Sequence, residues 1–317
     1  MSQQIRHEIT EAIIKALESD IIPWRRPWNM GKNAGHPANF LSRKSYRGIN
    51  PLILDLHARR YGLQSRWWGT FNQIKAAGGE VLRRPKDVAP GAWGAKVIYF
   101  APIKKTVVNK DTSEEENARF LLMRTYTVFN LDQTSGSALD ESRTSKDPAG
   151  NPEWADFAPA EELIEAAGIR VEHDGDMAFY RRPEPFDLWP NHTDGDYIVV
   201  PDKDRFHTLP DYYATVFHEL GHAAEIRTGW DHRKKGYELG ELAAEISSCY
   251  TASELGLPHG DLVNHARYVR HWIDAMKGNS SYVMAAATQA SKATDLLMGF
   301  VRKEEEVVED QAEAAMA

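Results

Sequence analysis

The sequence contains a single cysteine, Cys249, among 317 residues. One thiol cannot form an internal disulfide or a cysteine-rich zinc cluster, and such scarcity fits the reducing cytoplasm. No apolar run reaches the roughly 18 residues that a membrane-spanning helix needs. The N-terminus, Met1 to Glu8, is polar and lacks the apolar core of a secretory signal. We therefore expect a cytoplasmic protein that does not act on membranes.

The two signs of charge are unevenly distributed along the chain. Residues 1–131 hold 21 Lys and Arg against 11 Asp and Glu, whereas the remaining residues hold 17 against 35. Such asymmetry indicates a nucleic-acid-binding part joined to a part with another role. The length also allows two domains, each with its own core.

The periodicity of apolar residues predicts a two-domain α+β protein. We expect a small basic domain over 1–131, a polar linker over 132–158, a second domain over 159–303 and a frayed acidic tail over 304–317. The elements expected in the first domain are helices over 5–18, from Asn50 and over 71–77, strands over 80–83, 96–100 and 120–130, and a polar hairpin tip over 104–116. In the second domain they are helices over 159–167, from Leu209, around Glu241 to Glu245 and over 283–302, and strands over 169–172, 177–180 and 196–200.

Cations and aromatic residues alternate in the first domain, where residues 21–105 hold 16 Lys and Arg but only 3 Asp and Glu. This mixture suits sequence-tolerant binding of single-stranded DNA, because cations contact phosphates while aromatic rings stack on bases. No zinc finger, helix-turn-helix or RNP signature is visible, which disfavours specific readout of a duplex. The candidate DNA-binding residues are Trp24, Arg25, Arg26, Trp28, Arg43, Lys44, Tyr46, Arg47, Asn50 and Trp67. For the tryptophans Trp24 and Trp28, the alternative is a core position beneath the loop.

The second domain carries the motif His218-Glu219-Leu220-Gly221-His222, flanked by apolar residues. This spacing places two imidazoles one turn apart on one face of a helix, where both can reach one zinc ion. Glu219 is then placed to take a proton from a metal-bound water. The alternative is a buried helix whose histidines only form hydrogen bonds.

A catalytic zinc site needs a third protein ligand. Glu241 and Glu245 lie one turn apart in an otherwise apolar stretch, where two buried carboxylates without a cation would be costly. The pair resembles the second helix of gluzincins, in which one glutamate binds the metal and an acid one turn later orients the first histidine. The resemblance implies that Glu241 is the ligand and that Glu245 accepts a hydrogen bond from His218. Glu245 itself and His232 are the alternative ligands.

Both domains carry short motifs that are typical of one protein family. In the first domain they are Pro23-Trp24 with Pro27-Trp28, Tyr46-Arg47-Gly48-Ile49-Asn50, Thr70-Phe71-Asn72-Gln73, Gly78-Gly79 and Val128-Phe129-Asn130. In the second they are His218 to His222, Glu241 to Glu245, and Asn264-His265-Ala266-Arg267-Tyr268 with Trp272. These motifs resemble the ArdC-type antirestriction proteins, and the first domain also resembles the N-terminal part of TraC-type plasmid primases. The sequence departs from these relatives at Ala223-Ala224-Glu225 and at Gly240. The resemblance implies a single-stranded DNA-binding domain followed by a zincin-like metallopeptidase domain.

Three functions follow as hypotheses. The first is an antirestriction protein that binds DNA and protects incoming plasmid or phage DNA from host restriction. Its main ligand would be single-stranded DNA, with duplex DNA as a second ligand. The second is a zinc metallopeptidase that DNA binding brings to a host protein substrate, with Zn²⁺ or another divalent metal such as Mn²⁺ as cofactor. The third, an accessory module of a replication primase, ranks last because no primase catalytic motif is present.

Overall fold

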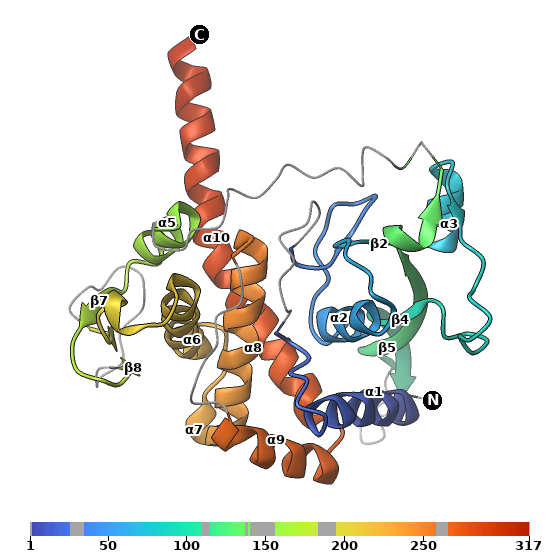
Figure 1. Ribbon diagram of the computed structural model, residues 1–317, viewed down its shortest axis with the longest axis horizontal. Coiled ribbons are helices and arrows are strands. Elements are labelled where there is room, and N and C mark those ends of the chain that lie inside the picture. The colour runs from blue at the N-terminus through green and yellow to red at the C-terminus, as the bar shows by residue number, and fades with distance from the viewer. Residues whose placement is uncertain are drawn as a thin grey trace.

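The computed structural model consists of an N-terminal half built on a β-sheet and a C-terminal half built mainly of helices (Figure 1). It describes residues 2–25, 35–108, 115–136, 139, 156–182, 195–257 and 266–316. We call residues 2–139 the N-terminal half and residues 156–316 the C-terminal half. Among the described helices, none combines the length and apolarity needed to cross a bilayer.

The N-terminal half is organised around a four-stranded sheet in the order β1-β2-β5-β4. Its strands are β1 (Ala38–Asn39), β2 (Trp67–Thr70), β4 (Ala95–Val108) and β5 (Glu115–Asn130). Strand β1 is parallel to β2, and the other neighbours are antiparallel. The hairpin of β4 and β5 pairs from Ala95 with Val128 out to Val108 with Glu115. Strand pairing therefore continues into 104–116, where the sequence predicts a polar tip.

Three helices accompany this sheet: α1 (Ser2–Leu17), α2 (Asn50–Tyr61) and α3 (Phe71–Ala76). Helix α1 starts three residues before the predicted range 5–18 and ends one residue short of its end, whereas α2 and α3 begin where the sequence predicts. Pro51 lies in the first turn of α2, and Gly62 ends it in the left-handed conformation. Thr70 caps α3 through a reciprocal pair of hydrogen bonds with Gln73.

The expected linker begins later than residue 132. Strand β6 (Thr134–Ser135) pairs with β3 (Glu80–Val81), and Leu139 is buried against Ile74 and Leu131 of the N-terminal half. Residues 140–155 of the expected linker lie outside the described residues. Its last three positions, 156–158, are described.

The C-terminal half combines a small sheet with packed helices. Helix α5 (Ala158–Ala167) precedes the strands β7 (Arg170–His173), β8 (Phe179–Arg181) and β9 (Tyr197–Val200), which form a sheet in the order β7-β9-β8. The later helices are α6 (Leu209–Arg227), α7 (His232–Lys235), α8 (Tyr237–Leu255), α9 (Ala266–Gly278) and α10 (Tyr282–Met316). Helices α6, α8 and α10 lie beside one another (Figure 1). The backbone of α10 is helical up to Met316, whereas the sequence predicts a frayed tail from residue 304.

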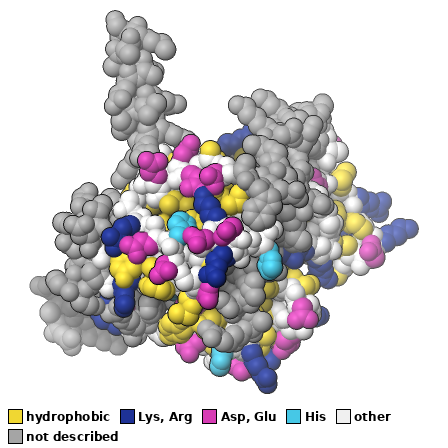
Figure 2. Space-filling view, turned by 60° about the vertical axis from the view of Figure 1, so that its left-hand side comes forward, with side chains coloured by type: hydrophobic (Ala, Val, Ile, Leu, Met, Phe, Trp, Pro, Cys, Tyr) yellow, Lys and Arg dark blue, Asp and Glu magenta, His cyan; other side chains and the backbone are white. Residues whose placement is uncertain are grey.

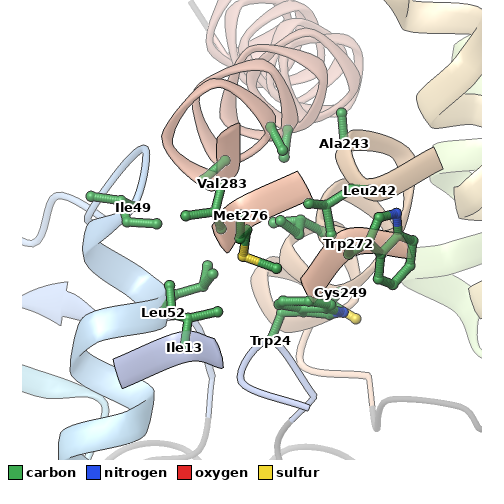
Figure 3. Close-up of a cluster of buried hydrophobic side chains, with 14 of the residues drawn as sticks. Ile13, Trp24, Ile49, Leu52, Leu242, Ala243, Cys249, Trp272, Met276 and Val283 are labelled. Carbon is green, nitrogen blue, oxygen red and sulfur yellow. The ribbon is translucent and has the colours of Figure 1, made fainter. Parts of the chain in front are cut away.

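One hydrophobic cluster contains residues of both halves (Figure 3). From the N-terminal half it includes Ile13, Trp24, Ile49 and Leu52, and from the C-terminal half Leu242, Trp272, Met276 and Val283. Other clusters lie within one half, as the two-domain prediction requires. Because burial of one such side chain contributes about 1.5–3 kcal/mol, the shared cluster holds the halves together as one unit.

Candidate metal centre

Helix α6 presents the two histidines of the sequence motif side by side. Thr208 caps the helix in a capping box with Asp211, and Pro210 lies in the first turn. The Nε2 atoms of His218 and His222 lie 3.2 Å apart. Only 12% and 11% of the two side chains is exposed, so the imidazoles converge at a nearly buried point.

Helix α8 supplies a carboxylate to the same point. Gly221 allows the close approach, because a Cβ at this position would lie 3.2 Å from the Cα of Ala244 on α8. Glu241 consequently places Oε2 3.6 Å from His218 Nε2 and Oε1 3.4 Å from His222 Nε2. The sequence places these residues on separate helices, and the helix packing brings them together.

The three donors fit a divalent metal ion. Their ligand atoms all lie within 4.8 Å of one another. Zinc binds nitrogen and carboxylate oxygen at about 2.0–2.1 Å in a tetrahedral arrangement, in which neighbouring ligand atoms are about 3.3 Å apart. The 3.2 Å between the two Nε2 atoms matches this edge length, and the carboxylate of Glu241 reaches one histidine with each oxygen, at 3.4 and 3.6 Å. Two histidines and one glutamate also form a known catalytic zinc ligand set.

Two further carboxylates approach the outer nitrogens of the histidines. Glu225 Oε1 lies 2.9 Å from His222 Nδ1, a hydrogen bond that fixes the ring and directs Nε2 toward Glu241. Glu245 Oε2 lies 4.0 Å from His218 Nδ1, too far for the direct hydrogen bond that the sequence predicts. The sequence analysis missed Glu225 as an orienting residue, although its position three residues after His222 on an apolar helix is a signal for it.

The charges of these groups stabilise one another. Burial alone would lower the pKa of His222, but hydrogen bonds to Glu225 and Glu241 and the charge of Glu219 raise it well above its ordinary value. Burial opposes ionisation of Glu241, yet hydrogen bonds from His218 and His222 hold the pKa of this carboxyl below its ordinary value. The carboxylate of Glu241 is therefore the form available to a cation.

Glu219 and a pair of tyrosines complete the surroundings of the site. Glu219 is buried at 7% exposure beside the histidines of α6. Tyr237, one turn before Glu241, is exposed and places its hydroxyl 3.3 Å from that of Tyr268 on α9. Partial desolvation of its hydroxyl, together with the neighbouring Tyr268 and Glu241, raises the pKa of Tyr237, so the hydroxyl stays protonated well beyond neutral pH. The sequence analysis missed Tyr237, whose spacing of four residues from Glu241 is the available signal.

The predicted DNA-binding residues fall into different environments. Trp24 is only 1% exposed and packs edge-on against Trp272, so the core alternative holds and its ring cannot stack on bases. Arg25 forms an ion pair with Glu245 in the C-terminal half, and only 14% of its side chain is exposed. Arg26 and Trp28 lie outside the described residues.

The Tyr-Arg-Gly-Ile-Asn string joins the two halves. Arg47 forms ion pairs with Glu254 on α8 and Asp295 on α10. The amide of Gly48 donates to Ser291 Oγ, and its carbonyl accepts from the Tyr250 hydroxyl. These contacts do not favour the prediction that Arg47 contacts DNA phosphates.

Two other members of the string have structural partners as well. Tyr46 is half-buried, and its amide donates to the carbonyl of Pro37. The Asn50 side chain donates to the carbonyl of Ile98 and accepts from its amide, which ties α2 to β4. Neither contact marks these side chains as a DNA-binding surface.

The remaining candidates form one surface cluster. The guanidinium of Arg43 lies 4.6 Å from the centroid of the Trp67 ring, and that of Arg66 lies 4.9 Å from it. Arg43 and Lys44 are exposed, and Trp67 is half-buried. We call Arg43, Lys44, Arg66 and Trp67 the β2 cluster.

The alternative metal ligands have different positions. Glu245 is fully buried one turn after Glu241. Its Oε2 lies 4.0 Å from Nδ1 of His218, whereas Glu241 approaches the other ring nitrogen, Nε2. The side chain of His232, in α7, and residues Asn264 and His265 lie outside the described set.

Comparison with known proteins agrees with this architecture. Residues 3–129 match the family model of the N-terminal domain of the anti-restriction factor ArdC, and residues 158–289 match that of zincin-like metallopeptidases. The metal-free crystal structure of the antirestriction protein ArdC from plasmid R388 matches with a TM-score of 0.71 and 30% identity, over 94% of this chain and 98% of that one. Its Mn(II)-bound form matches with a TM-score of 0.64 and 29% identity, over 93% and 97%.

Curated relatives match over most of this chain. Two DNA primases TraC of Escherichia coli are 31% and 29% identical over 94% and 96% of it, but the chain spans only 20% and 28% of their lengths. The protein y4eC of Sinorhizobium fredii is 28% identical over 92% of this chain and 90% of its own length. The zincin-like domain suggests a divalent metal, and His218, His222 and Glu241 form a group among the described residues that could hold one.

Both domain models match in the order of the two halves, and the R388 protein matches over nearly its whole length at 30% identity, so this chain belongs to the ArdC antirestriction family.

Proposed function

We propose that the protein binds single-stranded DNA through its N-terminal half and thereby protects incoming plasmid or phage DNA from host restriction. The β2 cluster carries this proposal, because it combines exposed cations with an aromatic ring in a half that is rich in Lys and Arg. Cations bind phosphates without regard to sequence, and aromatic rings stack on bases. Single-stranded DNA is the favoured ligand, with duplex DNA second. Such a function would be exercised in the cytoplasm.

The long hairpin offers a second set of groups of the same kind. Tyr99 and Tyr126 are 54% and 43% exposed, and their rings lie 6.4 Å apart. Arg124 is directly opposite Tyr99 in the β4–β5 register and is exposed. Figure 2 brings the C-terminal half forward: acidic side chains are spread over its centre together with some Lys and Arg, and further Lys and Arg side chains project at the right-hand edge. The excess of Lys and Arg over Asp and Glu in residues 1–131 favours the N-terminal half as the DNA-binding part.

The alternative function is a metallopeptidase that DNA binding localises near a host protein. Here His218, His222 and Glu241 would hold Zn²⁺, or Mn²⁺ in its place, and Glu245 would orient His218. In zincins the metal polarises the substrate carbonyl and activates a water. Glu219 would take the proton from that water, and the Tyr237 hydroxyl would donate a hydrogen bond to the carbonyl oxygen. The convergence of these three donors supports the metal-binding part of this alternative.

A role as an accessory module of replication is the third candidate. The relatives that support it are the TraC primases, of which this chain spans 28% at most. A single-stranded DNA-binding unit could serve both a primase and an antirestriction protein. The chain also matches 90% of the length of y4eC, so the same two-domain unit occurs in a relative of similar length as well as within the primases.

The salt dependence of single-stranded DNA binding tests the proposal. Each phosphate contact contributes about −0.7 to the slope of log affinity against log salt concentration, so Arg43→Ala with Lys44→Ala should reduce the slope by about 1.4 and weaken binding at low salt. The control is Lys234→Ala with Lys235→Ala, which removes two exposed cations of α7. If both double variants keep the wild-type slope, the β2 cluster does not contact DNA.

A further inference from the structure

The N-terminal half reaches the metal centre through one carboxylate. Trp24 Nε1 and Arg25 Nε each lie 3.2 Å from Glu245 Oε1, and both donate to it. More than 200 residues separate these partners in the sequence. Glu245 is 0% exposed, and Trp24 is 1% exposed in the cluster that joins the halves.

The two oxygens of Glu245 face different groups. Oε1 accepts both hydrogen bonds from the N-terminal half, and Oε2 lies 4.0 Å from Nδ1 of His218. A carboxylate whose first oxygen is fixed by two donors has little freedom to turn its second oxygen. At 4.0 Å this second oxygen is too far from Nδ1 for a direct hydrogen bond, so it acts on the ring through its charge, which favours a proton on Nδ1 and leaves Nε2 to face the other two donors.

Arg25 also compensates the charge of Glu245. A buried carboxylate is costly unless it is paired and hydrogen-bonded. Arg25 supplies the pairing charge at Oε1. Without Arg25, Glu245 would lose both this pairing charge and one of its two donors, so its carboxylate would be held less firmly beside His218.

We propose that Trp24 and Arg25 are positioning residues of the metal centre. They hold Glu245 beside Nδ1 of His218, the charge of Glu245 acts on that ring, and the affinity of the site for a divalent metal depends on these two contacts from the N-terminal half. The inference rests on the proposed metal role of His218, His222 and Glu241. It makes the metal centre a product of both halves.

A purely structural role is a weaker explanation of this contact. The apolar cluster already joins the halves, and Arg47 provides a second ion-paired arginine between them, to Glu254 and Asp295. Arg25 differs from Arg47 in that its partner also approaches a histidine of the metal centre. The pair of arginines therefore offers a matched control on the same chain.

The test measures the affinity of the full-length protein for Zn²⁺ by competition with a chromophoric chelator. Removal of a residue that contacts a metal ligand directly typically lowers metal affinity about 10–100-fold. Arg25 acts through Glu245, so we expect Arg25→Ala to lose affinity several-fold, at or below the lower end of this range. Arg25→Lys, which keeps the charge, should restore part of the loss. Arg47→Ala should leave Zn²⁺ affinity within about twofold of wild type. Unchanged affinity in Arg25→Ala, or an equal loss in Arg47→Ala, would overturn the proposal.

Two further variants separate the possible failures. Trp24→Phe keeps an aromatic ring in the core and removes one donor to Glu245, so it should lower the affinity for Zn²⁺ several-fold. This variant keeps the test decisive if Arg25→Ala does not fold. Wild-type affinity in Trp24→Phe would count against the proposal. Glu241→Ala tests the metal site itself. If Glu241→Ala retains Zn²⁺, the ligand assignment is wrong, whereas a loss there with wild-type affinity in Arg25→Ala overturns only the positioning role.

Discussion

Replacement of Glu241 by Gln should abolish the stabilisation of the fold by metal. Glu241 is the only anionic member of the three donors, and it lies 3.6 and 3.4 Å from the two histidine nitrogens. Gln preserves the volume and removes the charge. A ligand that binds only the folded state at 100 times its dissociation constant stabilises it by about 2.7 kcal/mol. At about 2–4 °C per kcal/mol, wild type should gain roughly 5–10 °C in melting temperature.

The assay compares thermal unfolding of each variant with Zn²⁺ and with chelator. The difference between the two conditions isolates metal binding from any effect of the substitution on the metal-free fold. Glu238→Gln is the matched control, since Glu238 is an exposed glutamate on the same helix. Wild type and Glu238→Gln should show the shift, and Glu241→Gln should lose most of it. A full shift in Glu241→Gln would refute the ligand assignment.

Two further predictions concern the scaffold. Gly221→Ala should lower the free energy of unfolding in denaturant by about 1–3 kcal/mol, because the added Cβ would lie 3.2 Å from the Cα of Ala244. The control is Gly299→Ala on α10, where a Cβ would meet no atom within 4 Å; it should be neutral or stabilising by up to about 1 kcal/mol. Burial lowers the pKa of His57 to about 4, so the folded state binds a proton at this site less readily than the unfolded state. The contribution of neutral His57 to the free energy of unfolding is therefore complete above the unfolded pKa of about 6.5 and is lost as pH falls toward 4. From pH 7.5 to 5.5, wild type should lose on the order of 1 kcal/mol more unfolding free energy than His57→Gln, and equal losses would contradict the assignment.

Local structure follows closely from the sequence. The capping residues Thr70 and Thr208 and the ends at Gly62 and Gly168 depend on contacts within a few residues, and the observed helices begin or end there. The two histidines of α6 are also a local pair, one turn apart. The position of Glu241 beside them depends on the packing of α6 on α8, and the resemblance to gluzincins predicts it correctly as a neighbour.

The surface of the N-terminal half could not be predicted in the same way. Composition shows that cations and aromatic residues are abundant there, but it does not show which of them face solvent. Trp24 is buried and Arg25 is partly buried because both contact Glu245, which belongs to the C-terminal half. Arg47 likewise forms an ion pair with Glu254 of the C-terminal half. Contacts across more than 200 residues leave no periodic signal, so the shared core was not visible in the sequence either.

We expect protection of incoming DNA to depend on the DNA-binding surface and not on peptidase chemistry. The direct measurement is the efficiency with which an unmodified plasmid enters cells that contain a restriction system. Wild type and Glu219→Gln should protect the plasmid equally, whereas Arg43→Ala with Lys44→Ala should lose protection. Full protection by that double variant, together with loss of protection in Glu219→Gln, would contradict the account and favour the metallopeptidase.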